Sequence, residues 1–172
     1  MNLQSTDFEL FGVAPRFTQD LAYLDARWKE LQRQVHPDKF ATQGAAAQRV
    51  AMQWSARINE AYRRLKNPLK RAAYLCELNG SPIEAENNTA MPAAFLMQQM
   101  ELREGLDDAS TPEELAQIAS LSESMWSQAL VDIERQADLE QDWPAATQTV
   151  RALMFLEKLA SDISRKRETL AA

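Results

Sequence analysis

The sequence predicts an all-α protein built from two helical modules, and three observations carry this prediction. Apolar residues recur at steps of three and four along most of the 172-residue chain, which is the spacing of amphipathic helices. No segment alternates apolar and polar residues with the period of two that marks a half-buried strand. Two long apolar stripes are joined by a short loop, and three further helical segments follow a stretch with two prolines. We therefore expect an N-terminal antiparallel helical hairpin with flanking short helices, and a C-terminal three-helix bundle.

The first module is predicted from two apolar stripes. One begins after Thr18 or Asp20, either of which can cap a helix, and it ends at Pro37, which pushes the preceding residue out of helical geometry. The second ends near Asn67-Pro68. The stripe residues are Leu21, Leu24, Trp28, Leu31 and Val35 in the first helix, and Ala47, Val50, Trp54, Ile58, Ala61 and Leu65 in the second. Short helices are expected over residues 7–11 and 69–78, with Asn79-Gly80 as a helix stop.

The second module is predicted to begin after a linker, for which we take residues 79–92. This stretch contains two prolines and lacks a sustained apolar stripe. Helices are then expected over residues 93–109, from Thr111-Pro112 onward, and from about residue 142 to 169. Thr111 and Glu114 have the spacing of a capping box. The last helix is expected to bury Leu153, Leu156, Ala160 and Ile163.

Composition excludes several classes of function. One cysteine and one histidine cannot form an internal disulfide, a Cys/His zinc site or a four-cysteine cluster, and four glycines with no Gly-x-Gly spacing argue against a phosphate-binding loop. No apolar run approaches the ~20 residues of a membrane-spanning helix, and the N-terminus lacks the pattern of a secretory signal. We expect no cofactor, no metal and a cytoplasmic location.

The net charge of −6 divides unevenly along the chain. Residues 1–75 hold 12 Lys and Arg against 7 Asp and Glu, a balance of +5, whereas residues 76–172 hold 7 against 18, a balance of −11. A chain this acidic is not designed as a whole to bind nucleic acid or an anionic membrane. This difference in charge suggests two modules that bind different partners. The alternative is that the surface charge of the two halves drifted apart without any functional cause.

The sharpest motif is His36-Pro37-Asp38, in the loop between the two long helices. Proline stiffens the loop, while histidine and aspartate offer hydrogen-bonding groups at fixed positions. Lys29 and Arg33 share one face of the preceding helix. The arrangement resembles the J-domain of Hsp70 co-chaperones, which we assign to residues 1–78. The resemblance implies that this face docks on the nucleotide-binding domain of an Hsp70 and favours ATP hydrolysis. The residues assigned to this contact are His36, Pro37, Asp38, Arg27, Lys29, Arg33 and Lys39.

Two other interpretations of this half of the chain remain open. His36 could act as a catalytic base, but no serine, cysteine or carboxylate arrangement supports a nucleophilic site. A set of basic residues could bind RNA, or could be the solvated side of the hairpin, which is favoured because no aromatic residues are clearly interleaved for base stacking. These residues are Arg49, Arg57, Arg63, Arg64, Lys66, Lys70 and Arg71.

The remainder of the chain narrows the resemblance. Residues 33–40 (RQVHPDKF), 67–75 (NPLKRAAYL) and 94–104 (AFLMQQMELRE) are together similar to the HscB family of co-chaperones for iron–sulfur cluster biogenesis. This resemblance spans nearly the whole chain. It implies an Hsp70 partner of the HscA type and, as client, a cluster scaffold of the IscU type. The protein is then not an enzyme, and residues 93–172 form its client-binding domain. A general J-domain co-chaperone for unfolded clients is the alternative.

The helix over residues 93–109 has two apolar faces, and only one is needed for packing. Phe95, Leu102 and Leu106 form the natural core side, whereas a second face about 150° away is rich in methionine and bordered by acid. By resemblance, the scaffold-binding residues are Leu96, Met97, Met100, Glu101, Glu104, Asp108 and Phe155. Met100 stands where the family usually has leucine, and Asp108 where it usually has the longer glutamate. The alternative is that this face packs against the first module or in a dimer.

Overall fold

The computed structural model describes residues 2–84 and 91–172 and divides the chain into two compact units, Met1–Leu75 and Cys76–Ala172. Residues 85–90, which belong to the linker predicted over 79–92, lie outside the described residues. The elements in the first part of the chain are α1 (Asp7–Phe11), α2 (Leu21–Val35), the short 3-10 helix η1 (Pro37–Phe40), α3 (Ala45–Lys66) and α4 (Pro68–Leu78). Those in the second part are α5 (Ala93–Asp108), α6 (Pro112–Ile133), the π-helical turn η3 (Glu134–Glu140) and α7 (Trp143–Ala171).

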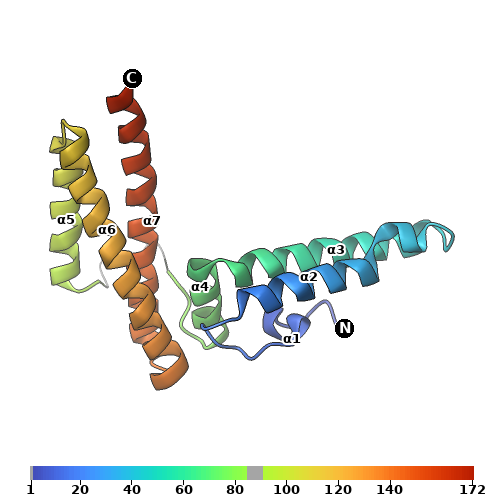
Figure 1. The fold of residues 1–172 in the computed structure, drawn as a ribbon. Coiled ribbons are helices and arrows are strands. Elements are labelled where there is room, and N and C mark those ends of the chain that lie inside the picture. The colour runs from blue at the N-terminus through green and yellow to red at the C-terminus, as the bar shows by residue number, and fades with distance from the viewer. Residues whose placement is uncertain (1, 85–90) are drawn as a thin grey trace. The chain divides into compact units, whose positions relative to one another are not determined.

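The N-terminal unit is an antiparallel hairpin of α2 and α3, with α1 packed against α3 (Figure 1). Asp20 caps α2 by accepting a hydrogen bond from the Tyr23 amide at 3.1 Å, which selects it over Thr18 as the cap. Apolar side chains from both helices fill the space between them. The buried residues of the two helices are Leu24, Leu31, Val35, Ala51, Ile58, Ala61 and Leu65.

Two residues of the predicted stripes are exposed, and Trp28, Ala47 and Trp54 are only partly buried. Leu21 is exposed because it is the first residue of α2, at the end of the hairpin. Val50 is also exposed, and its neighbour Ala51 is buried instead. One residue turns a helix by 100°, so a small difference in how α3 faces α2 exchanges these two positions.

In the C-terminal unit, α6 packs along α7 and α5 packs against both (Figure 1). Thr111 and Glu114 form the predicted capping box of α6, and Asp142 caps α7. One cluster of the core between the three helices is formed by Leu102, Leu106, Ala109, Leu115, Ala119, Leu156, Leu159 and Ile163, and the predicted Leu153 is buried as well. Ala160 was expected in this core but is exposed, and Leu159 is fully buried in its place.

The connection between α6 and α7 is a feature that the apolar pattern did not predict. The seven residues after α6, Glu134–Glu140, form a π-helix, and Gln141 then adopts a left-handed conformation with φ of 52°. The amide of Asp142 donates to the carbonyl of Gln136 at 2.8 Å and closes the turn. Arg135 pairs with Glu140 at 2.6 Å on its outer side.

The start of the predicted linker is described as well. Gly80 ends α4 in the left-handed conformation, with φ of 76°, as a glycine after a helix commonly does. The hydroxyl of Ser81 lies 2.7 Å from that of Thr147 on α7.

Candidate functional sites: a basic groove and an apolar patch

The His-Pro-Asp loop is shaped by the proline that follows His36. Residue 36 leaves helical geometry with ψ of 129°, and Pro37 begins η1. The His36 Nδ1 atom accepts a hydrogen bond from the Asp38 amide at 3.3 Å, and the His36 carbonyl accepts one from the Lys39 amide at 3.0 Å. Because Nδ1 is an acceptor, the neutral ring carries its proton on Nε2, a tautomer assigned from this hydrogen bond. The Asp38 side chain is 91% exposed, so both polar groups are accessible to a partner.

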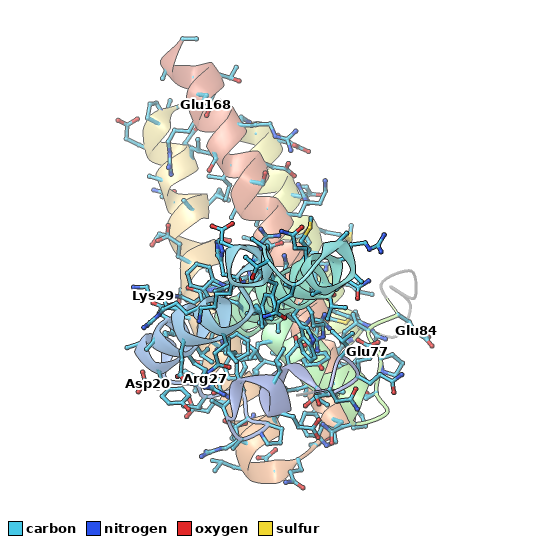
Figure 2. The ribbon with its side chains drawn as sticks, turned by 90° about the vertical axis from the view of Figure 1, so that its right-hand side faces the viewer. Asp20, Arg27, Lys29, Glu77, Glu84 and Glu168 are labelled. Atoms are coloured by element: carbon cyan, nitrogen blue, oxygen red, sulfur yellow. The ribbon has the colours of Figure 1, made fainter. Side chains whose placement is uncertain are left out.

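A groove runs along α2 to this loop, and its rim is basic. Lys29, Arg33, His36 and Lys39 line it, with Trp28 and Gln32 as the remaining lining residues. Four of the seven residues assigned to the Hsp70 contact therefore share one groove. Arg27 does not line it, because its guanidinium faces Glu30 at 3.1 Å. Figure 2 labels Arg27 and Lys29 on α2.

Asp25, an acidic residue of α2, is neutralised within the hairpin. Asp25, one turn before Lys29, accepts hydrogen bonds from the Lys66 ammonium and, at 2.5 Å, from the Tyr62 hydroxyl. These two contacts hold the pKa of the Asp25 carboxyl below its usual value of 3.8. Asp25 therefore subtracts little from the positive potential along α2.

Several basic residues considered for an RNA-binding face have structural roles instead. Arg57 and Arg64 pair with the buried carboxylate of Asp7 at 2.8 and 3.0 Å. Arg71 is buried and donates to the carbonyls of Phe17 at 2.6 Å and Leu65 at 2.5 Å. These arginines hold α1 and α4 in place, so they are not a solvated surface available to nucleic acid.

The apolar patch lies on α5. The side chains of Met97 and Met100 are 62% and 63% exposed, and Leu96 is half-buried. Glu101, Glu104 and Asp108 are exposed on the same helix. Leu102 and Leu106 are buried in the bundle as expected, so α5 keeps a second apolar face with an acidic border.

Phe155, the residue of α7 assigned to scaffold binding, packs against the core of the bundle. It is half-buried on α7 and meets the ring of Phe95 edge-to-face, with 6.1 Å between centroids. The Arg103 guanidinium lies 5.4 Å from the Phe155 ring centroid and pairs with Asp162 at 2.6 Å. A partner would therefore reach only the outer part of Phe155. Phe95 was expected in the core and is only partly buried.

Two sets of residues were missed from sequence. The sequence pattern does not single out Asp7, whose side chain is fully buried between two arginines. Gln32, Ser55 and Asn59 connect α2 to α3 by hydrogen bonds under the groove. The spacing of four between Trp28 and Gln32, and between Ser55 and Asn59, places each pair on one helix face and was the available signal.

Together, the hairpin with its His-Pro-Asp loop and the helical bundle define a two-domain J-domain protein. Comparisons with known proteins identify the family within this class. The chain is 45% identical to the co-chaperone protein HscB homolog of Burkholderia cenocepacia, over 99% of this chain and 98% of the relative. The corresponding homolog of Bordetella avium is 47% identical over 91% and 94% of the two chains. Residues 91–164 match the family described as the HSCB C-terminal oligomerisation domain.

Solved structures agree with this relationship. Chaperone HscB from Vibrio cholerae superposes with a TM-score of 0.84 at 35% identity, covering 96% of this chain and 99% of that one. Human co-chaperone protein HscB superposes with a TM-score of 0.91 at 25% identity, covering 97% and 84%. The chain therefore belongs to the HscB family of J-domain co-chaperones.

Membership of the HscB family confirms the function that the sequence resemblance implied. The protein is a co-chaperone that stimulates the ATPase of an HscA-type Hsp70 and delivers an IscU-type scaffold to it in the maturation of iron–sulfur proteins. In the described part of the chain, no helix has the length and apolarity needed to cross a membrane.

Proposed function

We propose that the protein performs this function through two surfaces, one in each unit, and that it catalyses no reaction itself. The basic groove with the His-Pro-Asp loop would contact the Hsp70, and the apolar patch on α5 would hold the scaffold. The single observation that carries the proposal is the gathering of Lys29, Arg33, His36 and Lys39 around one groove. Its support is chemical, because a basic rim next to a rigid polar loop suits an acidic partner surface.

In the groove, the residues would have different roles. Lys29, Arg33 and Lys39 would provide electrostatic steering and orientation, while His36 and Asp38, fixed by Pro37, would make the contacts that favour ATP hydrolysis. Arg27 would contribute from outside the groove. Its pairing with Glu30 makes its expected share the smallest.

On α5, Met97 and Met100 would supply adaptable apolar contact, with Leu96 beside them and Phe155 at the edge. Glu101, Glu104 and Asp108 would form the acidic border and favour a basic segment of the scaffold. The description of the matched family as an oligomerisation domain makes a second copy of this chain the rival occupant of the patch.

We also propose the domain assignment 1–78 for the J-domain, 79–92 for the linker and 93–172 for the client-binding domain. The division into two units between Leu75 and Cys76, inside α4, and the start of α5 at Ala93 support it to within a few residues. A cytoplasmic location is proposed because the Burkholderia and Bordetella relatives named above are bacterial and Cys76 is a free, buried thiol, as suits a reducing compartment.

The groove is tested by single-turnover ATPase assays of the HscA-type Hsp70 with His36→Gln. We expect loss of stimulation, with Gln34→Ala as the control, because Gln34 is exposed on the same helix and its side chain donates to that of Glu30. Stimulation by His36→Gln at the wild-type level would overturn the proposed role of the loop.

The patch is tested by calorimetric titration of the IscU-type scaffold with Leu96→Ala/Met100→Ala. Truncating two apolar contact side chains is expected to weaken binding by about 2–4 kcal/mol. The control is Leu121→Ala/Val131→Ala, which removes two exposed apolar side chains from α6. Unchanged scaffold binding would exclude the patch. If the double variant instead lost a concentration-dependent dimer seen in ultracentrifugation, the patch would be an interface between copies.

A further inference from the structure

Beneath the basic groove, four hydrogen bonds tie α2 to α3. The Gln32 side chain donates from Nε2 to the Asn59 Oδ1 atom at 2.8 Å and to the Ser55 carbonyl at 3.1 Å. Its Oε1 atom accepts from the Ser55 hydroxyl at 2.8 Å. The indole Nε1 of Trp28 donates to the same Asn59 Oδ1 at 2.9 Å. We call Gln32, Ser55 and Asn59 the polar clasp.

Most hydrogen-bonding atoms of the clasp have partners within the hairpin. Both amide hydrogens and the oxygen of Gln32 have partners, and so does the indole N–H of Trp28. All four bonds are partly buried and cross from one helix to the other. A second polar contact joins the two helices at the end away from the loop, where Asp25 accepts from Tyr62 and Lys66, and the buried residues between these two polar contacts are apolar. Apolar contacts are non-directional, whereas hydrogen bonds have preferred angles, so the clasp fixes the rotation of α2 on α3 at the end nearer the loop.

The clasp lies directly under the functional surface. Gln32, a member of the clasp, and Trp28, which donates to it, also line the groove with the basic residues. Positions 28, 32 and 36 follow one another at steps of four, so the His36 end of α2 lies one turn beyond Gln32 on the same face. Any rotation of α2 would move His36 relative to the rest of the groove.

We propose that Gln32, Ser55 and Asn59 are positioning residues, which hold the His-Pro-Asp loop in the orientation needed to stimulate the Hsp70. This inference rests on the proposed role of the groove. The clasp residues need not contact the Hsp70, because the Gln32 amide, the Ser55 hydroxyl and the Asn59 Oδ1 atom are occupied within the hairpin.

The roles of the groove residues predict which kinetic parameter changes. Lys29, Arg33 and Lys39 carry long, flexible side chains that can still reach an acidic surface from a slightly rotated helix. The His-Pro-Asp loop is short and stiff and has no such freedom. Loss of the clasp should therefore lower the maximal stimulated ATPase rate and leave the half-saturating concentration nearly unchanged.

The test compares Asn59→Leu and Gln32→Ala with wild type in single-turnover ATPase assays over a range of co-chaperone concentrations. We expect the maximal stimulation to fall about tenfold, since small misplacements of a positioned group reduce rates on this scale. The half-saturating concentration should change less than about threefold. Asn59→Asp keeps the acceptor for Trp28 and Gln32 and should retain at least half of the stimulation. Gln34→Ala, the same change two residues along on α2, should match wild type.

Structural effects are separated by two further measurements. Far-UV circular dichroism at the assay temperature confirms that each variant is folded, and Ser55→Ala, which removes one bond only, provides a milder variant if Asn59→Leu unfolds. In NMR spectra, the Trp28 indole N–H signal should shift in Asn59→Leu and persist in Asn59→Asp.

The outcomes distinguish the clasp from the groove. If folded Asn59→Leu and Gln32→Ala stimulate as well as Gln34→Ala while His36→Gln does not, the clasp only stabilises the hairpin and the inference is overturned. If His36→Gln itself stimulates normally, the proposed function of the groove fails first, and the inference falls with it.

Discussion

The buried carboxylate of Asp7 provides the sharpest test of how the J-domain is held together. This carboxylate is completely inaccessible and lies 2.8 Å from Arg57 and 3.0 Å from Arg64, both on α3. Its backbone amide donates to the Tyr74 hydroxyl of α4 at 3.0 Å. One residue of a five-residue helix thus connects α1 to both α3 and α4.

We predict that Asp7→Asn destabilises the N-terminal unit by about 2–4 kcal/mol. Removing one partner of a buried ion pair costs about 3–5 kcal/mol, because the remaining charge is left unpaired. The cost here is smaller, since Arg57 also donates to the Ser5 carbonyl at 2.8 Å and Arg64 to Glu60 at 2.8 Å. For a unit of this size, the melting temperature should fall by about 10–20 °C.

The measurement is urea unfolding of the full chain followed by NMR signals of the N-terminal unit, so that the two units are read separately. Asp38→Asn is the control, because its side chain is almost fully exposed. A loss below about 0.5 kcal/mol for Asp7→Asn, or an equal loss for Asp38→Asn, would refute the reasoning.

Three further predictions concern the C-terminal unit. Hydrogen bonds from Ser110 and Thr111 lower the pKa of the Glu114 carboxyl in the folded protein below its usual 4.5. The ionised carboxylate therefore contributes fully to stability above pH 4.5, and this contribution is lost as the pH falls through the lowered pKa. Glu114→Gln should reduce this acid dependence in melting curves from about pH 7 to 3. The free energy of unfolding of Gly105→Ala in urea should stay within about 1 kcal/mol of wild type. The added Cβ would lie 2.6 Å from the Ile118 Cδ1 atom, the flexible end of that side chain, and the cost of moving it is offset by the better helix propensity of alanine. Gly105→Val should be less stable than Gly105→Ala. Burial raises the pKa of the Cys76 thiol, so iodoacetamide should label the native protein at a rate on the order of 10⁻³ or less of that in urea, and fast native labelling would contradict the burial.

The helices and the loop motif were predictable because their signals are local. Asp20, Thr111 with Glu114, and Pro37 act within one helical turn, and their capping and stop roles follow from residue type and spacing. The basic residues of the groove share a helix face by spacing alone.

The misses arise from contacts between distant segments. A helical wheel cannot choose between Val50 and Ala51, or between Leu159 and Ala160, because the crossing of two helices decides which neighbour faces the core. The buried ion pairs of Asp7 and the hydrogen bonds of the polar clasp join residues that are 23 to 57 positions apart in the sequence. The spacing of residues within one helix does not show which residues of another helix they contact. The partial burial of Phe155 likewise depends on its contact with Phe95, 60 positions away.

The central claim is that one chain uses two surfaces together, and tethering gives it a directly testable consequence. Joining the activator to the client raises their effective concentration at the Hsp70, which separate molecules do not achieve. The decisive measurement is the single-turnover ATPase rate of the HscA-type Hsp70 with the IscU-type scaffold present, using His36→Gln, Leu96→Ala/Met100→Ala and an equimolar mixture of both. The account predicts that the mixture stimulates no more than Leu96→Ala/Met100→Ala alone and stays below wild type. A mixture that matches the wild-type rate would show that the two surfaces work independently and would contradict the account.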